Sequence, residues 1–184
     1  MPDTNVSADT NGMGKKAGRR PCSLLFQAGV MLLSIAAMIT ALALRLSLDN
    51  SSSRALPLFF FGVSAFLGIA ISLFHIFRVW SFVQDGYART SPLKAMAYML
   101  LPFFNLYWIF VVVHGFARDY NSLIQRKRLS APPLPHSLHL GCCVLFAASA
   151  LPYVGVAASF LLPVAWLLVM GSNCRAVSRL SPYV

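Results

Sequence analysis

The sequence predicts an all-α fold: a polytopic integral membrane helical bundle with four to five membrane-embedded helices. Of its 184 residues, 58% are hydrophobic and only 11% are charged, whereas about 25% of the residues in soluble domains are charged. Its uncharged runs also match the roughly 20 apolar residues that a helix needs to cross a bilayer. We therefore expect the chain to lie in a lipid bilayer.

The polar residues 1–20 are predicted to form a disordered, basic cytoplasmic tail, which precedes a transmembrane helical domain at 21–180. Two basic clusters are expected to contact anionic lipid headgroups. They are Lys15, Lys16, Arg19 and Arg20 in the tail, and Arg126, Lys127 and Arg128 in a loop. Because the net charge of +10 falls in short clusters beside apolar runs, a bilayer is a better partner for it than nucleic acid.

The basic residues also divide the apolar part of the chain. Three runs of 23 or 24 residues carry no charge, and a fourth run of 46 residues is interrupted by Pro152 and Gly155. A single helix of that last length would greatly exceed the bilayer thickness, so two helices are expected there. The predicted helices cover about 22–44, 56–79, 93–117, 137–152 and 155–174.

The topology of the 93–117 segment is left open by the sequence. If it crosses as one kinked span, with the N-terminus cytoplasmic, seven Lys and Arg residues lie inside and eight outside. If it turns back at Pro102–Asn105, the count is 13 inside and 2 outside, which is a strong positive-inside pattern. Base rates slightly favour the kinked span, because a returning backbone must be covered by protein.

Four residues form a candidate polar or hinge site: Pro102, Asn105, Pro152 and Gly155. Unwound backbone at membrane depth is where transporters bind solutes, but an interhelical hydrogen bond or a turn cap is the more common role of such an asparagine. The stretches Leu-Pro-Phe-Phe-Asn at 101–105 and Leu-Pro-Tyr-Val-Gly at 151–155 are similar. Both an internal repeat and chance recurrence fit this single match.

The sequence lacks the residues of common catalytic sites. It has no nucleophile elbow, no phosphate-binding glycine loop and no carboxylate within an apolar run. The cysteines lack metal-ligand spacing, and all are expected to be reduced because Cys142 and Cys143 are adjacent within an apolar run. A haem bound by His75 and His114 requires both at one depth, which only a returning third segment allows. We therefore expect no enzyme activity, no catalytic residue, no cofactor and no metal.

Leu101–Phe110 reads LPFFNLYWIF and Gly115–Asn121 reads GFARDYN. With the loop from Pro132 to Leu138 and the Asn-Cys pair at 173–174, these motifs resemble a family of uncharacterised bacterial multi-pass membrane proteins. Their signature is (I/L)PFFNxYWxF…GxAxDxN, and some members are fused to a GYF-like domain. The resemblance covers about residues 98–180 and implies a location in the bacterial cytoplasmic membrane. It implies no activity, and no catalytic residue is carried over.

These observations predict a small multi-pass membrane protein that is not an enzyme. Its expected role is that of a scaffold or accessory subunit acting through helix–helix and lipid contacts, with a membrane protein or a second copy of the chain as partner. The alternative is a small-solute or lipid transporter or channel that uses the broken helices at Pro102–Asn105 and Pro152–Gly155.

Overall fold

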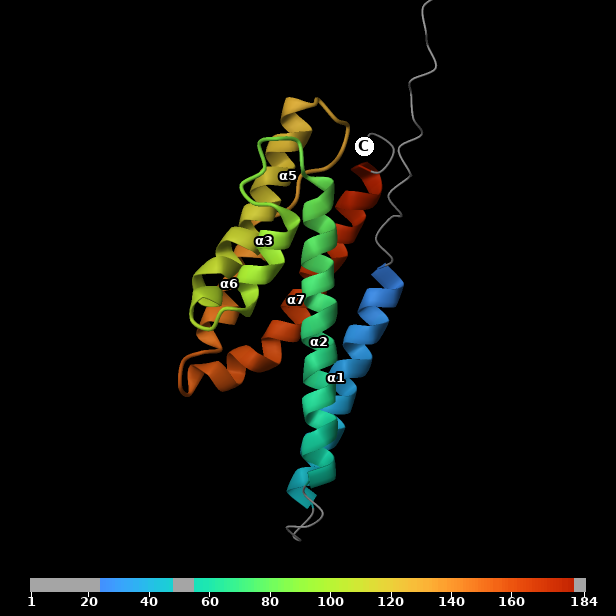
Figure 1. The fold of residues 1–184 in the computed structure, drawn as a ribbon, viewed down its shortest axis with the longest axis vertical. Coiled ribbons are helices and arrows are strands. Elements are labelled where there is room, and N and C mark those ends of the chain that lie inside the picture. Colours follow the sequence, from blue (N-terminus) through green and yellow to red (C-terminus); the bar gives the residue numbers. More distant parts are fainter. Residues whose placement is uncertain (1–23, 48–54, 181–184) are drawn as a thin grey trace, which may run out of the picture.

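The computed structural model describes residues 24–47 and 55–180, and all the regular elements in these ranges are helical (Figure 1). This confirms the all-α prediction for the described part of the chain. Two long helices, α1 (Leu24–Ser47) and α2 (Ala55–Phe82), follow one another in the chain and form an antiparallel hairpin. The predicted basic tail, with Lys15, Lys16, Arg19 and Arg20, lies outside the described residues.

The segment expected as one helix over 93–117 consists of two antiparallel arms (Figure 1). The first arm is α3 (Pro92–Ala97) with the 3₁₀ turn η2 (Tyr98–Leu100). The second arm is α4 (Phe104–Ile109), the π-helical turn η3 (Phe110–His114) and α5 (Gly115–Arg126). Pro102 explains the break, because proline disfavours helical backbone at the preceding residue and cannot donate a helix hydrogen bond. The segment therefore turns back, as in the second of the two predicted topologies.

The last part of the chain forms another hairpin, α6 (His136–Ala148) and α7 (Val154–Leu180). The break between them falls at the predicted Pro152–Gly155, although α6 ends earlier and α7 continues further than the predicted 137–152 and 155–174. Pro163 lies inside α7, which is bent along its length (Figure 1). The turns of this hairpin and of the preceding one lie on the same side, facing away from the loops 83–91 and 127–135.

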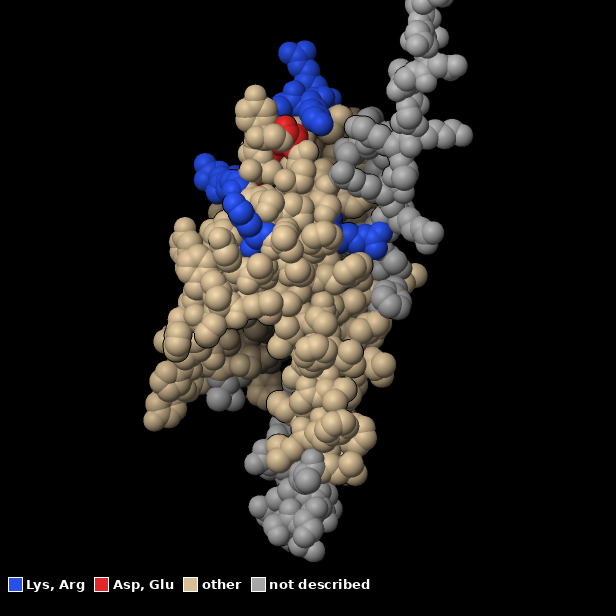
Figure 2. Space-filling view, viewed as in Figure 1, with Lys and Arg blue, Asp and Glu red and all other residues tan. Residues whose placement is uncertain are grey.

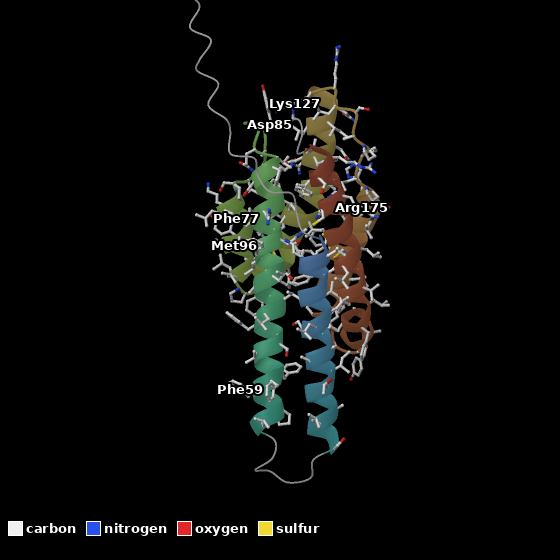
Figure 3. The ribbon with its side chains drawn as sticks, turned by 90° about the vertical axis from the view of Figure 1, so that its right-hand side faces the viewer. Phe59, Phe77, Asp85, Met96, Lys127 and Arg175 are labelled. Atoms are coloured by element: carbon white, nitrogen blue, oxygen red, sulfur yellow. The ribbon has the colours of Figure 1, made fainter. Side chains whose placement is uncertain are left out.

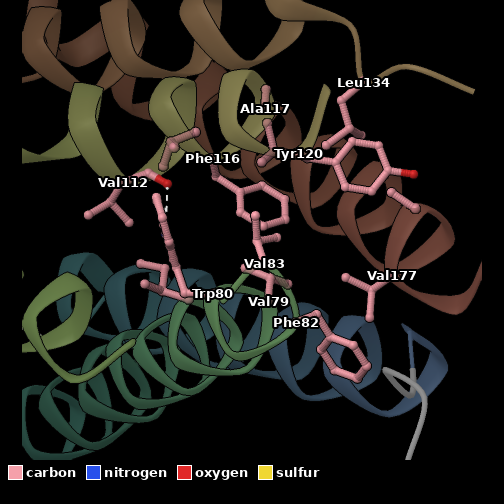
Figure 4. Packing of buried hydrophobic residues seen from close by; sticks show 14 of the residues in the cluster. Val79, Trp80, Phe82, Val83, Val112, Phe116, Ala117, Tyr120, Leu134 and Val177 are labelled. Carbon is pink, nitrogen blue, oxygen red and sulfur yellow. Dashed lines mark hydrogen bonds between the residues drawn. The ribbon is translucent and has the colours of Figure 1, made fainter. Parts of the chain in front are cut away.

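The hydrophobic core is built from buried residues of α2, η3, α5, α6 and α7, and Figure 4 shows part of it. Trp80 of α2 packs edge-on against Phe116 of α5, with ring centroids 5.8 Å apart. Its indole Nε1–H donates to the carbonyl oxygen of Val112, in the π-helical turn, at 3.1 Å. Val177 brings α7 into the same cluster. The second arm of the third segment thus packs against α2 and α6.

Two ion pairs fasten the 83–91 loop to α5. The Nε of Arg89 lies 2.9 Å from a carboxylate oxygen of Asp119, whose other oxygen accepts from the Arg89 backbone N–H at 3.0 Å. Arg126 donates to Asp85 at 2.6 Å, and its guanidinium lies 4.9 Å from the ring centre of Tyr87. Figure 3 places Asp85 and the neighbouring Lys127 at the same end. Both acidic residues of the described ranges are therefore paired with arginine.

In the described ranges, two helices are long and apolar enough to cross a membrane: Leu56–Phe82, with mean hydropathy 2.2, and Ala157–Leu180, with 1.6. In the first of these only 17% of the most apolar window is buried, and in the second 39%. Large apolar side chains on α2 stay exposed, among them Phe66 (70% exposed) and Phe59, which points outward in Figure 3. A helix in a water-soluble core would have these side chains covered.

Candidate functional site

The four predicted hinge residues lie in two turns with the same hydrogen-bond pattern. In the first turn the N–H of Phe104 donates to the carbonyl of Pro102 at 2.7 Å, and that of Asn105 donates to Leu101 at 3.1 Å. In the second turn the corresponding bonds, from Val154 to Pro152 and from Gly155 to Leu151, are both 2.8 Å. The central residues, Phe103 and Tyr153, have φ of 63° and 65°. Pro102, Asn105, Pro152 and Gly155 thus shape the two hairpin tips.

The residue types at these positions fit the turns. An added Cβ on Gly155 would lie 2.6 Å from the carbonyl oxygen of Ser149, so glycine permits the close approach of α7 to the end of α6. Asn105 is half-buried, and its backbone N–H makes the turn bond. None of the four residues lines the cavity described below. The structure therefore brings them together only as two pairs, one at each tip.

A chain of buried polar side chains connects four helices near the opposite end. The Nδ1 of His75 in α2 lies 2.8 Å from the Oε1 of Gln27 in α1. Its Nε2 lies 3.5 Å from the Nδ2 of Asn173 in α7, and the Oδ1 of Asn173 lies 2.9 Å from the Nε2 of His139 in α6. All four side chains are at most 4% exposed. We call Gln27, His75, Asn173 and His139 the buried polar chain.

The donors and acceptors of the buried polar chain can be arranged in two ways. With the side-chain amides as oriented here, His75 donates to Gln27 and His139 donates to Asn173, while the Nδ1 of His139 faces the carbonyl oxygen of Pro135 at 2.9 Å. Two hydrogen bonds from His139 to acceptors require both its nitrogens to carry protons. Reversing both amides lets two neutral imidazoles satisfy every contact.

An apolar cavity of about 250 Å³ lies next to the buried polar chain. It is bordered by α1, α2, η2, α4, α6 and α7. Its lining residues are Met31, Ser34, Ile35, Ala65, Gly68, Ile69, Ser72, Ile76, Met99, Ile109, Cys142, Phe146, Leu162, Pro163 and Trp166. Figure 2 shows the surface hollowed below the region of basic side chains. Trp166 joins the two features, because its ring packs edge-on against His75 at 6.4 Å and its Nε1–H donates to the Ser72 hydroxyl at 3.0 Å.

The predicted basic loop is held by Asn121. The Oδ1 of Asn121 accepts from the N–H of Leu134 at 2.8 Å, and its Nδ2 donates to the Leu134 carbonyl at 3.0 Å. These paired bonds fix the 127–135 segment on α5. Arg126 is engaged with Asp85, whereas Lys127 and Arg128 are exposed and form no ion pair within the described residues. The side chains of Lys127 and Arg128, which directly follow α5, therefore point outward.

The structure gives the histidines and cysteines separate environments. Both ring nitrogens of His75 contact amide groups, and His114 packs against His136, with ring centroids 5.9 Å apart. Within the described ranges, no three His, Cys, Asp or Glu side chains are grouped as metal ligands would be. Cys142 and Cys143 are buried free thiols, but Cys174 is disulfide-bonded, so the expectation that all cysteines are reduced is wrong there.

Gln27 and His139 were not predicted as site residues from the sequence, and Asn173 was predicted only as part of a motif. Each of these polar residues lies in or beside an apolar run, where an unpaired polar group costs several kcal/mol, and this position alone indicates a buried hydrogen-bond partner. The chain matches no protein-family model, no curated protein and no solved structure.

Proposed function

We propose that this chain is a multi-pass protein of the bacterial cytoplasmic membrane with a cytoplasmic N-terminus. Many of its exposed large apolar side chains lie along α1, α2 and α7 and at the two hairpin tips. On the face shown in Figure 2, every lysine and arginine drawn in blue lies in the upper half. The proposal assigns the basic end to the cytoplasm, where positive residues collect.

In this arrangement the α1–α2 hairpin crosses the bilayer, and the other two hairpins enter from the cytoplasmic side and turn back within it. Their tips carry Phe103 and Tyr153, which are 88% and 93% exposed, as suits side chains in contact with lipid. The 13 to 2 distribution of Lys and Arg between the two sides supports the same topology. The hydrogen bonds made by the turn N–H groups reduce the cost of irregular backbone at membrane depth.

The disulfide at Cys174 opposes this orientation. Cys174 precedes Arg175, near the basic end, and disulfides persist mainly outside the reducing cytosol. We give more weight to the basic residues, because they are spread over several segments, whereas Cys174 is 1% exposed and shielded from reductants.

The orientation can be tested by labelling cysteines in intact cells with a membrane-impermeant maleimide. Tyr87→Cys in the 83–91 loop and Ser130→Cys in the 127–135 loop are expected to react only after the membrane is opened. The unsubstituted chain gives the background. Labelling of Ser130→Cys but not Tyr87→Cys in intact cells would mean that the third segment crosses the bilayer. Labelling of both would reverse the orientation.

We propose that the protein acts without catalysis, as a scaffold or accessory subunit. The observation that supports this is the uncovered lower half of the α1–α2 hairpin, which extends beyond the other helices (Figure 1). In that half, α2 exposes Phe59 and Phe66, so its apolar surface is available to lipid and to a partner helix. The small residues Ser64 and Gly68 on the same helix suit close helix packing, and both already face Ser34 of α1.

A photo-reactive amino acid at Phe66 tests this role. Irradiation of membranes should join it to a protein of defined mass, either a partner or a second copy of the chain. The matched control is Leu93, which is 62% exposed at the basic end and should give no such adduct. If Phe66 gives only lipid adducts, and the purified protein is a monomer, the scaffold role loses its support.

The cavity favours a second function, that of a lipid or small-solute transporter. Transport would then use the apolar cavity and not the two turns, because Asn105 and Gly155 do not line it. Ala65→Phe should reduce flux in proteoliposomes by filling the cavity, while Asn105→Ala should leave it unchanged. Equal flux in Ala65→Phe and the unsubstituted protein would exclude this route.

A further inference from the structure

We propose that the apolar cavity binds one acyl chain of a membrane phospholipid, which enters from the side of the bundle along α2. The cavity opens to the outside at Ile69, which lines it and yet is 56% exposed. The surface is also hollowed in the lower half of Figure 2. The inference rests on the membrane location proposed above, but not on the scaffold role.

The cavity has no polar group available for a polar ligand. The Ser72 hydroxyl donates to the carbonyl of Gly68 at 2.7 Å and accepts from Trp166. The Ser34 hydroxyl donates to the carbonyl of Ser64. Because apolar cavities without unsatisfied polar partners stay dry and take up apolar molecules, the occupant should be hydrocarbon. At about 250 Å³, the cavity is below the roughly 300–1,000 Å³ of sites for drug-sized ligands, and a single flexible chain fits it better than a bulky ring system.

The depth of the cavity matches a chain whose headgroup lies at the basic end. Ile69 and Arg78 are nine residues apart on α2, which corresponds to about 14 Å along the helix. One leaflet of the hydrocarbon core is about 15 Å thick. A phospholipid with its phosphate at the level of Arg78 would therefore place the deeper part of its acyl chain at Ile69. Lys94 precedes the lining residue Met99 on the neighbouring arm, so the headgroup would lie between two basic elements.

Trp166 reports on the cavity directly, because it lines the cavity but is only 8% exposed. The full chain is incorporated into vesicles of phospholipid brominated on its acyl chains, since bromine quenches indole fluorescence on contact. The contribution of Trp166 is the signal of the unsubstituted protein minus that of Trp166→Phe. We expect brominated lipid to reduce this contribution at least twofold relative to unbrominated lipid.

Ala65→Phe fills the cavity from α2, and Met99→Phe fills it from η2. Each should restore at least half of the lost Trp166 signal, compared with the corresponding Trp166→Phe double variant. Ala70→Phe is the matched control, because Ala70 is exposed on the same helix and does not line the cavity; it should leave the quenching unchanged. Two filling variants on different elements keep the test decisive if one fails to fold.

Two results would overturn the proposal. The first is quenching in Ala65→Phe and Met99→Phe equal to that of the unsubstituted protein, which would show that surrounding lipid reaches Trp166 by another way. The second is relief of quenching by an added isoprenoid quinone at low molar fraction, which would identify a different occupant. Flotation after an alkaline wash is measured separately, so that failure to insert, which would contradict the membrane location, is distinguished from an empty cavity.

Discussion

Phe103 and Tyr153 hold nearly the same backbone conformation at the tips of two different hairpins, with φ of 63° and 65°. Each follows Leu-Pro, and each lies between a proline carbonyl and the N–H that donates to it. This is a γ-turn with positive φ, a rare and strained turn for any residue other than glycine. The two stretches at 101–105 and 151–155 therefore form the same type of turn.

Glycine at either tip should relieve this strain. We expect Phe103→Gly and Tyr153→Gly each to raise the free energy of unfolding by up to about 1 kcal/mol, because glycine adopts positive φ without steric cost. The side chains lost are 88% and 93% exposed, so little packing within the chain is removed. Unfolding in mixed micelles with increasing denaturing detergent measures the change.

Val154→Gly is the control for this prediction. Val154 is the first residue of α7 and is also exposed, so glycine there should destabilise the protein by up to about 1 kcal/mol through helix propensity. Destabilisation by Tyr153→Gly equal to that by Val154→Gly would show that the turn stores no strain.

The buried polar chain should contribute strongly to stability. We expect Asn173→Leu to lower the free energy of unfolding by about 1–3 kcal/mol, because it leaves the Nε2 atoms of His75 and His139 buried without a hydrogen-bond partner. Ser159→Leu, at an exposed position of the same helix, should change stability by less than about 0.5 kcal/mol. The measurement is the same detergent titration.

A double-mutant cycle separates the energy of the contact between His139 and Asn173 from the effect of losing either side chain alone. Once His139 is replaced by leucine, Asn173→Leu should cost less than in the unsubstituted protein, because its buried partner has been removed. Strictly additive effects would mean that the contact between the His139 Nε2 and the Asn173 Oδ1 contributes no coupling.

The sequence was sufficient for the local features of this fold. Pro152 and Gly155 predicted the break between α6 and α7, and the composition predicted helices that expose apolar side chains. The 93–117 segment remained open, because Pro102 can either kink a helix or end it, and only the contacts of Trp80 and Phe116 with their neighbours hold the second arm in place. The buried polar chain depends on residues 34 to 98 positions apart, and no local pattern encodes such pairings.

The ion pair between Asp85 and Arg126 should make stability depend on pH. Burial raises the pKa of the Asp85 carboxyl. Hydrogen bonds from Arg126 and the Tyr87 N–H, together with the charge of Arg126, lower this pKa by more than burial raises it. The net pKa lies below the ordinary value. The stabilisation is therefore complete above about pH 4, the value for an unfolded chain, and is lost as pH falls through the lower folded value.

We accordingly expect Asp85→Asn to destabilise the protein at pH 7 by no more than about 1 kcal/mol, because the Arg126 side chain is 40% exposed and water screens the pair. The difference from the unsubstituted protein should shrink below about pH 4. Lys127→Ala, next to Arg126 but without an ion pair in the described ranges, should show no such convergence. A constant Asp85→Asn difference down to pH 3 would contradict this origin.

Gly155 and Gly141 offer the sharpest comparison of two helical glycines. An added Cβ at Gly155 would lie 2.6 Å from the Ser149 carbonyl oxygen and 3.1 Å from its carbon, both backbone atoms that cannot move independently of the turn. At Gly141 no atom lies within 4 Å of the added Cβ. Gly155→Ala should therefore destabilise the α6–α7 hairpin by about 1–3 kcal/mol, whereas Gly141→Ala should stabilise α6 by up to about 1 kcal/mol through helix propensity. Equal effects of the two substitutions in the detergent titration would mean that α7 does not approach the end of α6 as closely as the second turn requires.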